Sequence, residues 1–213
     1  MYIQDLFSSS TNDNRHETTS SAMTWVAYLL SVNPKVQERL RREIRDAIPN
    51  LETDITSAQT DSLPYLNAVC NETLRLYPTV PITSRESIVD TMLGDQAIPK
   101  GTPLMIVPWA INRSPQHWGP NAEVFDPERW MKEGTANTGG AASNYAAITF
   151  LHGPRSCIGQ AFARSEMKCL VATFFGRFRV ELAMPEKDVW PAGVITTKAA
   201  NGMHIRLEPV DGW

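Results

Sequence analysis

The chemistry of this sequence centres on Cys157, which lies just ahead of a predicted helix. Backbone N–H groups and the helix dipole at such a position favour a thiolate over a thiol. Gly153 and Gly159 remove side chains on both sides of the cysteine, so a flat group can approach the backbone closely. Arg155 offers a cation to an anionic group, and Phe150 supplies an apolar wall. A thiolate, a flat ligand with carboxylates and an apolar wall together point to haem.

The alternative interpretation of Cys157 is a buried cysteine at a Gly-Pro turn, because a free cysteine is usually a small core residue. The fixed spacing of the surrounding residues favours the ligand. Cys70 and Cys169 lie on apolar faces of predicted helices, where we expect core packing. The chain has three cysteines and four histidines, with no Cys-x-x-Cys or His-x-x-x-His pair. A disulfide framework, a zinc ribbon and a zinc protease are therefore disfavoured.

The segment from Phe150 to Gly159 resembles the haem-binding signature of the cytochrome P450 family, Phe-x-x-Gly-x-Arg-x-Cys-x-Gly, at every fixed position. The resemblance implies that Cys157 is the metal ligand, the axial thiolate on the iron of haem b (iron protoporphyrin IX). It also implies that Arg155 contacts a haem propionate and that Phe150 lies against the ligand. Gly153 and Gly159 complete the cofactor-binding set.

The resemblance implies an activity as well. Members of this family are haem-thiolate monooxygenases, which insert one oxygen atom of O2 into an organic substrate. The implied partners are an NADPH-dependent flavin reductase, with cytochrome b5 as a further electron donor, and a small apolar organic substrate. The alternative is a truncated, catalytically inactive polypeptide that still binds haem or a partner.

A predicted helix carries Glu72 and Arg75, an Glu-x-x-Arg pair whose side chains share one face. A later Pro-Glu-Arg-Trp segment contains Arg129 and resembles the family's Pro-Glu-Arg-Phe motif, with tryptophan in place of phenylalanine. By that resemblance Glu72, Arg75 and Arg129 form a buried, structural ion network behind the haem. Glu38 and Arg41 have the same spacing, and we interpret them as a solvated surface pair.

Three further residues receive roles only from the resemblance. Arg85 matches an arginine that holds a haem propionate in many members, the alternative being an arginine on a strand surface. Glu17 and Thr18 match the end of the family's oxygen-activating motif, and they would be the catalytic pair. Glu17 would be the acid of a proton relay, and Thr18 the hydroxyl that hydrogen-bonds dioxygen. Ordinary helix-capping chemistry explains a Glu-Thr pair at a helix start equally well.

The elements that must position these residues form an α+β, mainly helical fold. Apolar residues at helical spacing predict helices, and prolines mark where these helices begin and end. The segments on either side of a Pro-Lys-Gly turn are predicted to be strands. Asn33 is the expected N-cap of the second helix, with Pro34 at its first position. The expected helices are 17–31, 34–47, 64–77 and 158–175, the expected strands are 82–89 and 101–109, and short strands are expected over 177–207.

The resemblance covers residues 16–213 and corresponds to the C-terminal half of the family's domain, so the fold would be incomplete without the N-terminal half. Residues 1–15 do not match and read as an irregular leader. The family expects two small residues where this chain has Asn14 and Arg15. The chain would thus be a fragment, without the membrane anchor or the helices that roof the substrate pocket.

Composition narrows the classes of protein and of partner that remain possible. The 213 residues are 42% apolar with a net charge of −3, which supports a globular core and disfavours nucleic acid as a partner. No apolar run is long enough to span a bilayer, and the first residues do not resemble a secretion signal. Residues 150–180 carry five basic side chains and one acidic one, which fits docking of an acidic electron donor. For an intact parent the resemblance implies the endoplasmic reticulum membrane, whereas this chain lacks an anchor and would be cytosolic or of unknown location.

Overall fold

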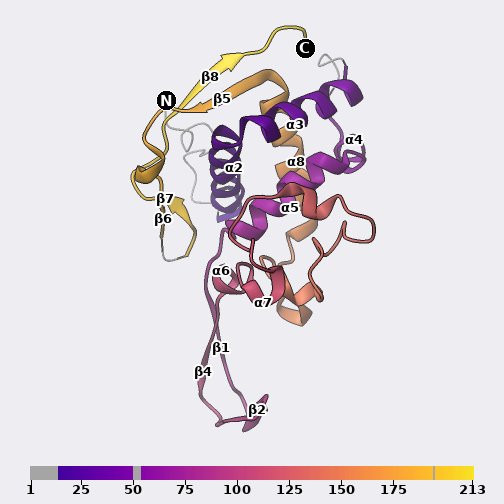
Figure 1. Ribbon diagram of the computed structural model, residues 1–213. Coiled ribbons are helices and arrows are strands. Elements are labelled where there is room, and N and C mark those ends of the chain that lie inside the picture. Colours follow the sequence, from indigo (N-terminus) through magenta and orange to yellow (C-terminus); the bar gives the residue numbers. More distant parts are fainter. Residues whose placement is uncertain (1–13, 50–53, 194) are drawn as a thin grey trace.

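Long helices form the centre of the molecule (Figure 1). The computed structural model describes residues 14–49, 54–193 and 195–213. The helices pack against one another in the middle of Figure 1, with the short helix α4 beside α8. The expected leader at residues 1–15 falls almost entirely outside the described residues, although α2 already includes its last two positions. The helices are α2 (Asn14–Val32), α3 (Pro34–Ala47), α4 (Ser57–Asp61), α5 (Pro64–Leu76) and α8 (Gln160–Arg177).

The main core lies where α2, α3, α5 and α8 meet. Trp25, Leu40, Leu66 and Phe175 come from these four helices in turn, and all four are fully buried. Burial of a side chain of this size contributes about 1.5–3 kcal/mol, so this junction holds the helices together. The apolar stripes recognised in the sequence therefore face one shared core.

Asn33 does not have the role expected from the sequence. It stands at the N-cap position of α3, but its side chain accepts no capping hydrogen bond. Its amide Nδ2 instead donates to the carbonyl of Leu29 at 2.8 Å, near the end of α2. Pro34 at the first position of α3 has no N–H to satisfy, so the asparagine is free to cap the preceding helix. The predicted N-cap position and the predicted bounds of α3 are confirmed, whereas the side chain of Asn33 does not form the capping hydrogen bond.

Arg41 is likewise not the surface residue expected from its spacing to Glu38. The two side chains do pair at 2.8 Å, but Arg41 is buried and only Glu38 is exposed. The guanidinium also donates to Gln37 Oε1 and to the carbonyl of Phe178, both at 2.8 Å. Arg41 therefore joins α3 to the first C-terminal strand, a contact that helical spacing cannot reveal.

A narrow hairpin leaves the body after α5 and extends away from it in Figure 1. Strands β1 (Thr83–Glu86) and β4 (Pro103–Ile106) pair antiparallel at its base, and β2 (Thr91–Leu93) and β3 (Gln96–Ile98) pair at its tip. The two expected strands thus exist as the shorter β1 and β4, whereas β2 and β3 lie between the expected ranges and were not predicted. The coil that follows contains α6 (Pro108–Ile111), α7 (Pro115–Trp118) and the 3-10 turns η1 (Pro127–Trp130) and η2 (Asn144–Ala146).

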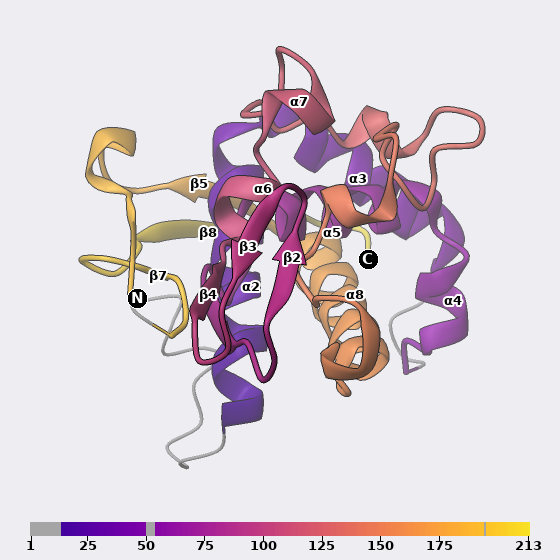
Figure 2. The same ribbon diagram turned by 90° about the horizontal axis from the view of Figure 1, so that it is seen from below.

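The C-terminal part forms two small antiparallel sheets on the side of the molecule opposite α8 in Figure 2. Strand β5 (Phe178–Leu182) pairs with β8 (Ile205–Pro209), and β6 (Pro191–Ala192) pairs with β7 (Lys198–Ala199), with a turn η4 (Glu186–Asp188) between them in sequence. These elements confirm the α+β, mainly helical fold class. Of the helices in the described ranges, none combines the length and apolar character needed to cross a membrane.

Candidate functional site

The loop that carries Cys157 is tightly folded and presents the thiol outward. It contains the 3-10 turn η3 (Gly153–Arg155), and Gly153 has φ of 75°, a conformation that favours glycine. Leu151 has φ of 58°, which is rare for a residue with a branched side chain. The N–H of Cys157 donates to the carbonyl of Phe150 at 2.8 Å and closes the loop. Cys157 is a free, exposed cysteine.

The surface around the thiol is apolar. Helix α8 begins at Gln160, two residues later than expected, and Gly159 stands at its N-cap. Ile158 is fully exposed beside the cysteine, and Phe162 in the first turn of α8 is 69% exposed. Large exposed apolar side chains indicate a surface that binds a ligand or a partner. Here they lie next to a helix N-terminus and a free thiol.

The start of α2 and the cysteine loop share one hollow. Thr18 and Thr19 from α2 line it together with Phe150 and Ala163 from the two sides of Cys157. Leu74, Ala22, Met167 and Thr79 complete the lining. The structure therefore brings together residues that lie about 130 positions apart in the sequence. Thr79, just after α5, was not singled out from the sequence, because no motif marks it.

Glu17 is next to Thr18 in the chain but its carboxylate lies against the C-terminal segment. Its Oε1 accepts a hydrogen bond from Thr196 Oγ1 at 3.0 Å and pairs with Lys198 Nζ at 2.5 Å. The hydrogen bond from Lys198, followed by the one from Thr196, lowers the pKa of Glu17. The carboxylate is thus held ionised, and neither partner could be predicted from the helix itself.

The two arginines expected to hold haem propionates are placed differently. Arg155 is exposed within the turn that precedes Cys157. Arg85 is half-buried on β1, opposite Leu104 of β4, and donates to the carbonyl of Ser84 at 2.7 Å. Both guanidinium groups have solvent access, which an incoming anionic group requires.

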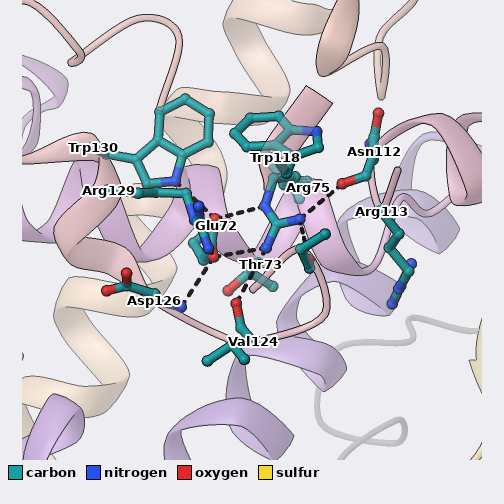
Figure 3. A network of polar contacts seen from close by, with 12 residues as sticks. Glu72, Thr73, Arg75, Asn112, Arg113, Trp118, Val124, Asp126, Arg129 and Trp130 are labelled. Atoms are coloured by element: carbon teal, nitrogen blue, oxygen red, sulfur yellow. Dashed lines mark hydrogen bonds and ion pairs between the residues drawn. The ribbon is translucent and has the colours of Figure 1, made fainter. Parts of the chain in front are cut away.

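Glu72 is the centre of a fully buried ion network, shown in Figure 3. Its two oxygens accept the Nε and Nη2 of Arg75, both at 2.8 Å, and Oε1 also accepts Arg129 Nε at 2.9 Å. Oε2 accepts the indole N–H of Trp130 at 2.9 Å, and Oε1 accepts the backbone N–H of Asp126 at 3.0 Å. The sequence indicated the charged members, whereas the indole donor was not anticipated.

The balance of charges keeps Glu72 ionised. Burial raises the pKa of this carboxyl, but the hydrogen bond and charge of Arg75, followed by the charge of Arg129, outweigh burial and lower it. Trp118 lies over both cations, with its ring centre 4.8 Å from the Arg75 guanidinium and 5.7 Å from that of Arg129. The network is therefore satisfied from several elements at once.

Asn112 connects this network to the cysteine loop. Its carbonyl accepts Arg75 Nη1 at 2.8 Å. Its side chain accepts the N–H of Ile148 at 2.8 Å and donates to Thr149 Oγ1 at 2.9 Å. Thr149 precedes Phe150, so the network fixes where the cysteine loop begins. No sequence signal marked Asn112.

Trp130→Phe should lower the free energy of unfolding by about 2 kcal/mol, because a hydrogen bond to a charged group contributes about 1.5–3 kcal/mol. The ring remains, so the loss reports mainly the missing donor to Glu72. Urea unfolding followed by circular dichroism measures the change. Trp190→Phe, at a partly exposed position, is the matched control and should change the midpoint very little. Equal effects of the two substitutions would contradict the role of the indole.

The sequence profile of the family described as Cytochrome P450 matches residues 15–204. This chain belongs to the cytochrome P450 family. The match includes α2 from its second residue, the ion network, the cysteine loop and strands β5, β6 and β7, and it ends one residue before β8.

Curated cytochrome P450 relatives agree with this assignment. The chain is 49% identical over 202 residues to cytochrome P450 monooxygenase sphH of Aspergillus fumigatus, covering 93% of this chain and 37% of that protein. It is 44% identical to cytochrome P450 monooxygenase ptmK of Penicillium ochrochloron, covering 90% and 38%. It is 36% identical to mouse cytochrome P450 4V2, covering 91% and 36%. The chain thus spans less than two fifths of the length of these relatives.

Cytochrome P450 proteins bind haem through a cysteine thiolate, and the residues of this chain fit that group. A free, exposed thiol stands among exposed apolar side chains. A Cβ added at Gly153 would contact no other atom, so the glycine is required by the backbone turn and not by lack of space. A Cβ added at Gly159 would lie 3.9 Å from the Cys157 sulfur. Within the described ranges no three His, Cys, Asp or Glu side chains gather to hold a metal ion. A haem iron held by a cysteine needs only that one protein side chain as a ligand, and no such group of three.

Proposed function

We propose that residues 16–213 form the haem-binding, C-terminal half of a cytochrome P450 monooxygenase domain. The observation that carries the proposal is the exposed Cys157 thiol in a loop whose first residue, Phe150, lines a hollow together with Thr18. When bound, the haem supplies the activation of dioxygen, which the thiolate ligand favours by donating electron density. The reaction inserts one oxygen atom into an organic substrate.

The residues of the cysteine loop and β1 hold the cofactor. Cys157 would bind the haem iron through its thiolate, and the apolar side chain of Phe150 would lie against the cofactor. Arg155 and Arg85 each pair with a propionate, because both guanidinium groups are accessible to solvent. Gly153 and Gly159 keep the face of the loop open. The half-buried Phe150 ring is itself backed by Arg164, whose guanidinium lies 5.1 Å from the ring centre.

Thr18 and Glu17 handle protons at the other wall of the hollow. Thr18 lines the hollow, and its hydroxyl would hydrogen-bond dioxygen there. Glu17, one residue earlier, holds its charge beside Lys198 and takes protons from solvent at its carboxylate oxygens. The hydroxyl then passes a proton inward, while the apolar neighbours Ala22, Leu74 and Met167 limit water.

Electrons come from NADPH through a flavin reductase, with cytochrome b5 as a second donor. Support for docking of an acidic donor comes from the excess of basic side chains in residues 150–180, the segment that contains Cys157. The substrate is a small apolar organic molecule, since the hollow is lined largely by apolar side chains. An intact parent chain resides at the endoplasmic reticulum membrane.

The carbon-monoxide difference spectrum of the reduced, haem-supplied chain tests the proposal. A strongly red-shifted Soret band is expected, because the thiolate shifts the absorbance of the iron-bound porphyrin. A band at an unshifted wavelength, or no haem band, would show that this polypeptide does not assemble a thiolate site. The monooxygenase activity would then belong only to a longer chain.

A further inference from the structure

The C-terminal segment around Thr197 is fixed to two parts of the molecule at once. The N–H of Thr197 donates to the carbonyl of Thr79 at 2.8 Å, and its Oγ1 donates to that of Pro78 at 2.7 Å. The carbonyl of Thr197 accepts the indole N–H of Trp25 at 3.2 Å and the hydroxyl of Ser21, both from α2. The segment therefore has one defined position relative to α2 and to the chain after α5.

The residues on either side of Thr197 both reach Glu17. Thr196 Oγ1 and Lys198 Nζ share the Oε1 atom of this carboxylate, at 3.0 and 2.5 Å. Thr196 is buried, whereas Lys198 and Glu17 are each about two fifths exposed. Two donors on a fixed segment thus hold one oxygen of a carboxylate that still contacts water.

A second carboxylate that packs on this end of α2 binds a different partner. Glu166 of α8 accepts the hydroxyl of Thr19 at 2.9 Å. Two carboxylates therefore lie near this end of α2, that of Glu166, which binds Thr19, and that of Glu17 on α2 itself. Among the described side chains Lys198 pairs with Glu17, so it favours the ionised carboxylate and holds it against the C-terminal segment.

We propose that Lys198, assisted by Thr196, is a positioning residue that holds the Glu17 carboxylate outside the hollow lined by Thr18. Protonation of Glu17 at Oε1 weakens the pairing with Lys198, and the neutral carboxyl then turns toward the Thr18 hydroxyl. Lys198 thereby sets the pH at which Glu17 delivers a proton. The role of Lys198 in proton delivery rests on the proposed function, whereas the ion pair between Glu17 and Lys198 does not.

Nuclear magnetic resonance of the full chain with 13C-labelled glutamate side chains tests the pairing without haem. Glu17→Gln identifies the Glu17 carboxyl signal, and circular dichroism checks that each variant is folded. Lys198→Met should move the titration midpoint of this signal upward, toward that of an ordinary glutamate, because the hydrogen bond and charge are lost. Lys198→Arg should keep it low. Lys187→Met, which removes an exposed cation from the same part of the chain, should leave the signal unchanged.

An unchanged Glu17 midpoint in Lys198→Met would overturn the proposal. The haem-supplied protein with a flavin reductase gives the second readout, the pH profile of NADPH-driven oxygen consumption. The limb that reports a protonated acid should shift to higher pH in Lys198→Met, and Lys198→Arg should restore it. A shifted carboxyl signal with an unshifted profile would show that Glu17 is paired but delivers no proton. The carbon-monoxide spectrum would still decide the haem-thiolate proposal independently.

Discussion

Cys157→Ala should abolish the red-shifted carbon-monoxide band of the haem-supplied chain. The substitution removes the exposed sulfur that lies just before α8, which is the proposed ligand of the haem iron. The loop should otherwise persist, because its closing hydrogen bond runs from the backbone N–H of residue 157 to the carbonyl of Phe150. The loss should therefore be complete in the spectrum and small in the far-ultraviolet circular dichroism.

Cys70→Ala and Cys169→Ala are the matched controls, and both should keep the shifted band. Burial raises the pKa of the Cys70 thiol to about 12, so this sulfur is protonated at neutral pH and is no thiolate ligand. Cys169 is partly buried on α8 and lies 3.9 Å from Thr60 Oγ1. If either control lost the band while remaining folded, the assignment of the ligand to Cys157 would be wrong.

Local signals in the sequence predicted the elements well. The second helix follows from a proline at its first position and an apolar stripe, and its bounds 34–47 are confirmed. The cysteine loop and the Glu72–Arg75 pair were recognisable because their residues are neighbours in sequence. Asn33 shows the limit of this reasoning, since an asparagine between two helices can hydrogen-bond to the end of the first or to the start of the second.

Long-range partners could not be predicted, because nothing in a helical pattern says which segment will cover it. Arg41 is buried only because β5 brings the carbonyl of Phe178 against α3. Lys198 meets Glu17 across 181 positions of sequence. Asn112 looked like an ordinary coil residue, although it joins the ion network to the cysteine loop. The residues of the candidate site were thus recognisable from motifs, whereas their long-range partners were not.

Glu72→Gln should destabilise the fold by about 3–5 kcal/mol, because it leaves buried cations without a counter-charge. Arg75 has a fully buried side chain, and that of Arg129 is 9% exposed, so water cannot replace the carboxylate. A loss of this size is a large part of the roughly 5–15 kcal/mol that stabilises a typical domain. Urea unfolding should show a much lower midpoint, and haem binding should weaken because Asn112 and the cysteine loop lose their support.

Glu38→Gln is the matched control, since Glu38 and Arg41 have the same spacing on a helix. Glu38 is 54% exposed, so its pairing should contribute at most about 1 kcal/mol. The pH dependence separates the two sites further. The pKa of Glu72 is lowered in the folded state, so its contribution to stability is present above the ordinary glutamate pKa and is lost as the pH falls through the lowered value. Glu72→Gln should remove this acid-side loss, and Glu38→Gln should keep it. Equal destabilisation by the two variants would mean that the buried network is no more important than an exposed pair.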